Sequence, residues 1–288
     1  MQPQQQSLIY LHIAVLLFGG TALFAKLINL NALDITVYRA AIAGLAIMIL
    51  LLWQKKAIKL SCAKDYLIAL LLGAAVGIHW VTYFAGMQMA GIAIGMIAFF
   101  TYPVITVFIE PFFNSSKPKV NDLLSAGVVI TGIYLLIPNV DMGNNVTLGV
   151  VTGIISAFFF AFRNIVHKRY FSHYAGPQTM FYQTLVASLL LCAFIEVPVI
   201  NIANQDLGLL VVAGVIFTAT PHSLFAASLQ YLSASTAGLI SCLQPLYGTF
   251  LAFLLLHEQP SLQTILGGAL VISAAFYETW SITRKHRL

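Results

Sequence analysis

Three side chains with polar tips stand close together in a long apolar run, at His79, Trp80 and Tyr83. His79 and Tyr83 are four residues apart, so a helix places them on one face. An ionisable group deep in an apolar helix costs roughly 3 kcal/mol unless it faces protein or water. We therefore expect His79 either to line a cavity with its two aromatic neighbours or to be a neutral side chain hydrogen-bonded to a neighbouring helix.

Two further polar side chains immediately precede prolines in apolar runs that lie 142 residues apart. Tyr102 precedes Pro103, and Gln244 precedes Pro245. Proline removes one backbone hydrogen bond and frees a carbonyl, which inside a membrane needs protein or a wet cavity beside it. Tyr102 and Gln244 are therefore predicted to offer polar groups to a ligand at equivalent places, and a static kink without a ligand is the alternative.

The second half of the chain supplies the remaining candidates. His222 follows Pro221, one residue out of register with His79 under the shift of 142, and helix packing is the alternative to ligand binding. Asn164 and Arg163 end an apolar run, where Arg163 either attracts a carboxylate or extends toward the membrane surface, the simpler role. The predicted substrate-binding set is His79, Trp80, Tyr83, Tyr102, Asn164, His222 and Gln244.

The composition indicates that membrane-spanning helices hold these residues. Of 288 residues, 60% are hydrophobic and 8% are charged, whereas a soluble domain carries roughly 25% charged residues. So few charges cannot cover a water-facing surface, and most of the outer surface must face lipid. Backbone amides in lipid must be paired within each segment, and the apolar runs are too long for barrel strands.

The predicted fold is therefore an all-α polytopic membrane protein with ten transmembrane helices. The expected spans are Ser7–Ile28, Asp34–Trp53, Asp65–Met87, Gly91–Phe113, Asn121–Ile137, Val146–His167, Pro177–Val197, Asp206–Gln230, Ser235–Leu256 and Leu262–Ile282. The first run lacks the basic region and small-residue cleavage site of a secretory signal, so we expect it to be retained. Ten spans place both termini on one side.

The distribution of lysine and arginine predicts which side that is. With cytoplasmic termini, twelve basic residues lie on the cytoplasmic side: Lys55, Lys56, Lys59, Lys64, Lys117, Lys119, Arg163, Lys168, Arg169, Arg284, Lys285 and Arg287. Only Lys26 and Arg39 remain for the other side, as the positive-inside rule requires. Arg39 lies about 7.5 Å inside the outer face by helical rise, and we expect it to extend outward. The net charge of +5 is thus a topology signal, and we predict no nucleic-acid partner.

The shift of 142 residues indicates an internal repeat. Besides the two prolines, it aligns Lys26 with Lys168 and Pro118 with Pro260. We expect a first five-helix repeat over residues 7–137 and a second over residues 146–282. Five is an odd number, so the second repeat enters the membrane inverted, an arrangement typical of secondary transporters whose substrate site lies at the midplane between the halves. A duplication that only builds a stable bundle is the alternative.

Several stretches resemble the EamA-type transporters of the drug/metabolite transporter superfamily. They are LLFGGTALFAK, DITVYRAAIAGL, FAGMQMAGIAIGMIAFFTYPVITVFIEPF and LQYLSASTAGLISCLQPLYGTFLAFLLLHEQPSLQTILGGALV. The resemblance extends from about Leu8 to Ile282 and implies ten helices in two inverted repeats, cytoplasmic termini and export of small metabolites, often amino acids. Members commonly carry a glutamate after the proline-bearing helix of each repeat. Glu258 fits the second repeat, but Ser116 occupies the corresponding place in the first.

Other functional classes lack their motifs. The chain contains no phosphate-binding GxxxxGK[ST] loop, no HExxH zinc pair and no GxSxG elbow, and Cys62, Cys192 and Cys242 have no metal-binding spacing. We predict that the protein binds no cofactor and is not an enzyme. No carboxylate is placed near a span centre, which disfavours coupling to protons through a midplane acid.

The expected function is alternating-access export of a small, partly apolar metabolite, such as an amino acid, across a bacterial inner membrane. The lipid bilayer and a small-molecule substrate are the predicted partners. Drug or sugar-conjugate transport, a polytopic enzyme acting on lipid and a ligand-sensing receptor are the alternatives. A lipid enzyme would require clustered catalytic side chains within the membrane, and a receptor would require a signalling domain.

Overall fold

The computed structural model describes residues 3–114, 120–137, 143–228, 231–232 and 240–285, and this part of the chain is helical without strands. The first half contains α1 (Pro3–Thr21), α2 (Phe24–Leu27), α3 (Ala32–Trp53), α4 (Ala63–Ala90), α5 (Ile92–Phe99), α6 (Tyr102–Asn114) and α7 (Val120–Leu136). The second contains α8 (Asn145–Tyr170), α9 (Gly176–Leu191), the 3₁₀ turns η1 (Cys192–Phe194) and η2 (Val199–Asn201), α10 (Asn204–Gly214), the π-helical η3 (Val215–Ala219), α11 (Thr220–Ser228), α13 (Gln244–Leu256) and α14 (Leu262–Lys285).

Within these ranges, six helical segments are long and apolar enough to cross a membrane. They are Gln4–Leu27, Ala32–Trp53, Ala63–Ala90, Ile92–Phe113, Asn145–Tyr170 and Asn204–Phe225. Each overlaps a predicted span, and shorter apolar helices occupy three further predicted spans, at Leu123–Leu136, Gln244–Leu256 and Leu262–Tyr277. The all-helical membrane class is confirmed, and the count of ten spans stays a prediction.

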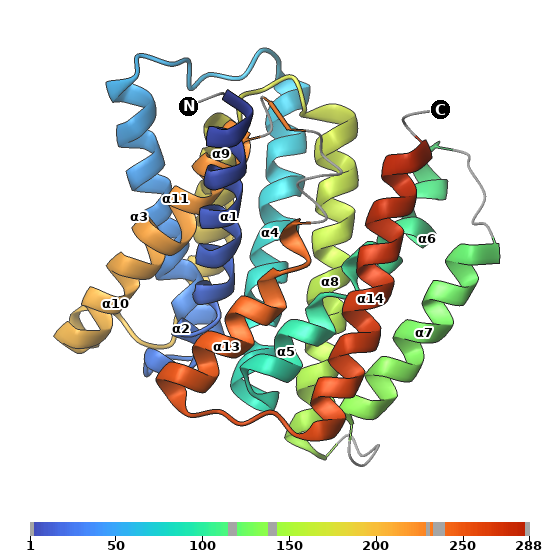
Figure 1. The fold of residues 1–288 in the computed structure, drawn as a ribbon. Coiled ribbons are helices and arrows are strands. Elements are labelled where there is room, and N and C mark those ends of the chain that lie inside the picture. The colour runs from blue at the N-terminus through green and yellow to red at the C-terminus, as the bar shows by residue number, and fades with distance from the viewer. Residues whose placement is uncertain (1–2, 115–119, 138–142, 229–230, 233–239, 286–288) are drawn as a thin grey trace.

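Both the first and the last helix reach the same end of the bundle (Figure 1). The start of α1, the end of α14 and the α3–α4 and α8–α9 connections lie there. The α4–α5, α9–α10 and α13–α14 connections lie at the opposite end. The exposed Lys55, Lys56, Lys59 and Lys64 belong to the first end, so the described connections alternate as the predicted topology requires.

Several spans are interrupted rather than continuous. α5 ends at Phe99 and α6 begins at Tyr102, while α13 begins at Gln244. Pro103 and Pro245 thus stand in the first turn of α6 and α13, where the missing N–H costs nothing because those amides have no partner within the helix. The two helices begin 142 residues apart (244 − 102), which matches the shift read from the sequence.

One predicted boundary is wrong. Pro177–Val197 is not one span, because α9 ends at Leu191 and the chain continues through η1 to a loop before Pro198. The predicted span Asp206–Gln230 overlaps the apolar helical segment Asn204–Phe225, within which η3 has π-helical hydrogen bonding. Gln230 and residues 235–239 of the ninth predicted span lie outside the described residues, as do Ser116, Lys117 and Lys119.

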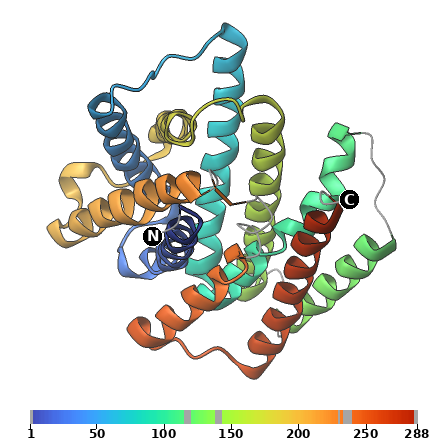
Figure 2. The ribbon, with the colours of Figure 1, turned by 45° about the horizontal axis from the view of Figure 1, so that its top comes forward.

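The packing of the helices is reciprocal between the halves. α4 packs along α8, and correspondingly α11 packs along α1. α3 packs against α9, its counterpart in the other half, and α7 packs against its counterpart α14. Figures 1 and 2 show α7 and α14 side by side at one flank of the bundle. Exchanging the two halves therefore converts each of these helix pairs into another of them or into itself.

Glycines allow the closest of these approaches. A Cβ added to Gly149 of α8 would lie 2.5 Å from the Ala90 Cβ and 2.8 Å from the Gly86 carbonyl oxygen of α4, and one added to Gly153 would lie 2.6 Å from the Ala98 Cβ. These distances are shorter than van der Waals contact, so only a hydrogen fits. Small residues at these positions thus let α8 approach α4 and α5 closely.

At both ends of the bundle, polar side chains form hydrogen bonds with the backbone of the loops that connect the helices. At the end away from the termini, the fully buried Asp34 carboxylate accepts hydrogen bonds from the Glu196 and Val197 amides, each at 3.0 Å. At the other end, the Gln178 amide nitrogen donates to the Ile58 and Lys59 carbonyls, each at 3.2 Å. Both side chains lie in the first turn of corresponding helices, α3 and α9, and both hold the loop of the opposite half.

We expect Asp34→Ala to lower the apparent melting temperature of the detergent-solubilised protein. The substitution leaves the two loop amides without an acceptor and removes charge-assisted hydrogen bonds, a loss of roughly 2–4 kcal/mol. Glu196→Ala is the matched control, since it removes an exposed carboxylate from the same loop but keeps the amide that Asp34 binds. Equal melting temperatures for both variants would contradict the role given to Asp34.

Candidate functional site

His79 lies near the middle of α4 with its side chain 5% exposed. Its Nδ1 is 2.7 Å from Ser156 Oγ of α8, and that hydroxyl donates to the His79 carbonyl at 3.0 Å. Because a hydroxyl has one proton, both bonds are made when Nδ1 carries the histidine proton. Nε2 is then an acceptor, and it makes no hydrogen bond to the part of the chain that the structure describes.

An aromatic cluster surrounds the His79 ring. Its members are Tyr83 of α4, Phe99 of α5, Tyr102 of α6 and Phe160 of α8. The His79 ring centroid is 4.9 Å from that of Phe160, 5.1 Å from that of Phe99 and 5.8 Å from that of Tyr83. Tyr102 stacks on Phe99 at 5.3 Å and meets Phe160 edge-on at 4.9 Å. The structure thus brings the predicted residues His79, Tyr83 and Tyr102 together.

Besides Phe160 of α8, the second half reaches this cluster through the start of α13. The Gln244 side chain lies within interaction range of the Tyr83 hydroxyl, and the buried Cys242 lies within range of Tyr102. The Tyr83 hydroxyl is buried and makes no hydrogen bond of good geometry to the described residues. Gln244 is therefore placed at the edge of the cluster, near Tyr83 of α4.

Trp80 lies beside a different group, the Arg39 guanidinium. Arg39 of α3 is 2% exposed, with its Cζ 4.4 Å from the Trp80 ring centroid and 4.9 Å from that of Phe84. Its Nη1 donates to Thr218 Oγ1 of η3 at 2.9 Å. The expectation that Arg39 extends to the membrane surface is wrong, because α4 and η3 enclose it.

Arg163 is also directed inward. Its Nε donates to Oε1 of the fully buried Gln183 at 2.6 Å, its Nη1 to Asn164 Oδ1 at 2.9 Å, and its Nη2 contacts Met180 Sδ at 3.8 Å. The surface-reaching role expected for Arg163 is therefore wrong. Asn164 serves here as an acceptor for Arg163.

His222 of α11 packs edge-on against Phe18 of α1, with ring centroids 4.8 Å apart. Helix packing is the alternative to ligand binding expected for His222, and this contact is of that kind. His222 and His79 each lie within electrostatic range of both Arg39 and Arg163. The described residues hold no group of three His, Cys, Asp or Glu side chains suited to a metal ion.

Sequence reasoning missed Ser156, Phe99, Phe160 and the inward direction of Arg39. Phenylalanines in an apolar run give no signal of which face they take. Phe158 is 45% exposed, whereas Phe160, two residues later, joins the cluster. For Arg39 a signal existed, since a cation more than one turn inside a span is costly unless it faces protein.

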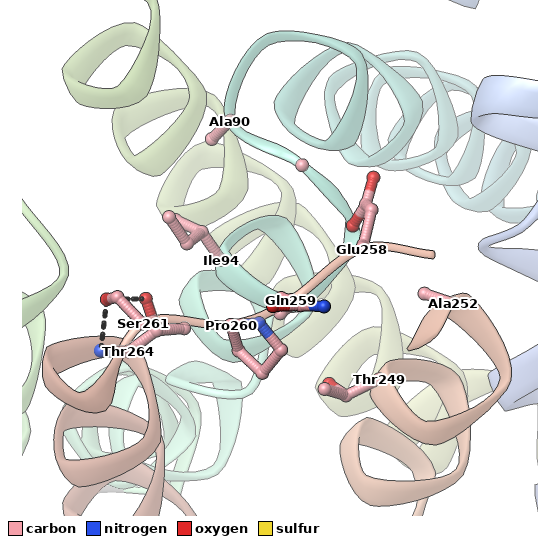
Figure 3. Close-up of a pocket in the computed structure, with 11 residues that line it drawn as sticks. Ala90, Ile94, Thr249, Ala252, Glu258, Gln259, Pro260, Ser261 and Thr264 are labelled. Carbon is pink, nitrogen blue, oxygen red and sulfur yellow. Dashed lines mark hydrogen bonds between the residues drawn. The ribbon is translucent and has the colours of Figure 1, made fainter. Parts of the chain in front are cut away.

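A separate cavity of about 310 Å³ lies between α5, α13 and the α13–α14 connection, and Figure 3 shows its lining. Glu258 borders it and accepts a hydrogen bond from the Ile92 amide at 3.0 Å, which caps α5 across the two halves. The cavity begins at Ala90, about 16 Å along α4 from His79 by helical rise. It is therefore distinct from the aromatic cluster, and Glu258 serves as a helix cap.

Comparison with known proteins agrees with this architecture. An uncharacterized transporter of Bacillus subtilis, YxxF, is 25% identical to this chain, and the match covers 93% of this chain and 87% of YxxF. YoaV, another uncharacterized transporter of B. subtilis, is 23% identical over 86% of this chain and 87% of its length. A protein of known crystal structure, 16% identical in sequence, superposes on this chain with a TM-score of 0.65. The match covers 97% of this chain and 98% of the crystallised chain, which indicates a shared fold.

The family profile described as the EamA-like transporter family matches the chain twice, over residues 5–137 and 147–278. Together these matches cover most of the 288 residues. The chain is a multi-pass membrane protein with two EamA domains, and it belongs to the EamA-like transporter family.

Proposed function

We propose that the protein exports small, partly apolar metabolites, amino acids in particular, across the inner membrane by alternating access. The observation that carries this proposal is the cluster of His79, Tyr83 and Tyr102 with Phe99 and Phe160, which combines apolar ring faces with polar tips. Aromatic rings supply apolar contact area while their polar groups fix a ligand's orientation. The cluster lies where α8 of the second half packs on α4, α5 and α6 of the first, and α13 of the second half packs on α5.

The reciprocal packing supports the alternating-access part of the proposal. Two halves that make equivalent contacts can exchange conformations at little cost in free energy, so that the binding region faces each side of the membrane in turn. Asp34 and Gln178, which hold the opposing loops at the two ends, are the contacts that such an exchange would break and remake. The excess of basic residues at the terminal end supports cytoplasmic termini.

Counterflow into proteoliposomes tests the proposal. Purified protein is reconstituted with an unlabelled L-amino acid inside, and uptake of the same radiolabelled amino acid is followed for a panel of aromatic, aliphatic, polar and charged members. We expect saturable counterflow for apolar members and none in protein-free liposomes. Absence of counterflow for every amino acid would refute the amino-acid assignment, and activity with a drug or a sugar conjugate would replace it.

A further inference from the structure

Arg39 is a buried cation whose hydrogen-bonding capacity is largely unused. Nη1 donates to Thr218, but Nε and Nη2 make no hydrogen bond within the described part of the chain. A guanidinium stays charged in proteins, and a buried charge without a counter-charge is expensive. The faces of Trp80 and Phe84 offset part of this cost through cation–π attraction. These ring faces cannot accept hydrogen bonds from the remaining N–H groups, which point outward in the plane of the guanidinium.

The surroundings hold the guanidinium in a fixed orientation. Thr218 Oγ1 gives its proton to the Ala213 carbonyl at 2.7 Å, so its lone pairs are free to accept from Arg39. Thr218 belongs to the π-helical segment η3, and such segments occur frequently at functional sites. Trp80 lies against the face of the guanidinium, and Thr218 binds Nη1. The edge that carries Nε and Nη2 makes no hydrogen bond to either residue.

Tyr83 adds a second unused polar group. Its buried hydroxyl makes no hydrogen bond of good geometry to the described residues, although the Gln244 side chain lies near it, and it lies within electrostatic range of Arg39. Two guanidinium N–H donors beside a hydroxyl donor match the planar, acceptor-only geometry of a carboxylate. A carboxylate would also supply the negative charge that Arg39 lacks.

We propose that Arg39 and Tyr83 form the carboxylate subsite of the transported ligand, an inference that rests on the proposed function. His79 lies one helical turn from Tyr83 on the same face of α4, and its Nε2 acceptor suits the ammonium group of an amino acid. The ligand's carboxylate then binds at Arg39 and its side chain contacts Phe99, Phe160 and Tyr102. Arg39 is enclosed in this conformation, so the ligand enters when the two halves separate.

Trp80 fluorescence measures occupancy of this subsite directly, because its ring contacts the guanidinium. In a Trp53→Phe, Trp280→Phe background, Trp80 is the single tryptophan. The purified protein is titrated with L-phenylalanine, with 3-phenylpropionate, which lacks the amine, and with phenethylamine, which lacks the carboxylate. We expect saturable changes with both carboxylates and a much weaker response to phenethylamine.

Variants then assign the response to Arg39 and Tyr83. Arg39→Gln is expected to weaken 3-phenylpropionate binding at least about 30-fold, and Tyr83→Phe about three- to tenfold. Lys56→Gln, which removes an exposed cation, is expected to leave binding unchanged. Where Arg39→Gln does not fold, Arg39→Lys and Tyr83→Phe carry the test, with Arg39→Lys expected to weaken binding about tenfold or more because it lacks the planar fork.

Two outcomes overturn the subsite: no saturable response to either carboxylate, or unchanged affinities in Arg39→Lys and Tyr83→Phe. These outcomes are distinguishable from failure of the proposed function. Carboxylate binding that depends on Arg39, without counterflow of any amino acid, would keep the subsite and remove the transport assignment. Amino-acid counterflow that is unaffected in Arg39→Lys and Tyr83→Phe would keep the transport assignment and remove the subsite.

Discussion

Replacing His79 by alanine is expected to reduce counterflow to the level of protein-free liposomes. The substitution removes the Nε2 acceptor, the bond to Ser156 and a ring that touches Phe99 and Phe160. It therefore removes a ligand contact and also leaves a cavity, which destabilises a close-packed interior. The measurement is the initial rate of counterflow for the amino acid that the panel identifies, normalised to the amount of folded protein.

His79→Asn separates these two effects. An asparagine amide occupies the place of Nδ1 and can keep the bond to Ser156, but it has no group at the place of Nε2. We expect this variant to recover much of the folded protein while transport stays about tenfold or more below the parent. Ser156→Ala is the converse control, since it keeps the imidazole and removes only its anchor. Full transport by His79→Asn would show that His79 serves packing alone.

The sequence predicted those features that depend on local rules. Pro103 and Pro245 lie in first turns of helices because proline is tolerated there, and their shared register located the starts of α6 and α13. His79 and Tyr83 share a face because helical spacing places them so. Tyr102 joins them because its helix packs along α8, which the break after α5 makes possible.

Features that depend on tertiary partners were not predictable in this way. Helical rise placed Arg39 about 7.5 Å from a membrane surface, where the cost of a cation indicated that it faces protein but not that α4 and η3 would enclose it. Hydropathy extended the seventh span to Val197, whereas the Asp34 carboxylate holds residues 196 and 197 in a loop. The inward direction of Arg163 likewise depends on Gln183 in another helix.

The close approach of α4 and α8 leads to the second large effect. These helices carry His79 and Ser156, so their separation sets the geometry of the site. At Gly149 even one methyl group would lie 2.5 Å from the Ala90 Cβ and 2.8 Å from a backbone oxygen. Neither neighbour is a flexible side chain that can move aside, because the backbone of α4 lies directly behind both.

We expect Gly149→Ala to destabilise the protein by roughly 1–3 kcal/mol and Gly149→Leu to prevent folding. Gly127→Ala and Gly127→Leu are the matched controls, because Gly127 also lies within a helix but has nothing within 4 Å of its added Cβ. Since alanine is favoured over glycine inside helices, Gly127→Ala should preserve or raise the melting temperature. Glycine-to-alanine substitution is thus expected to change the melting temperature in opposite directions at these two helical glycines. A thermal shift assay in detergent, with size-exclusion profiles of all four variants, measures both changes. A Gly149→Leu variant that eluted as a folded monodisperse protein and kept counterflow would refute the contact between α4 and α8 on which the position of His79 depends.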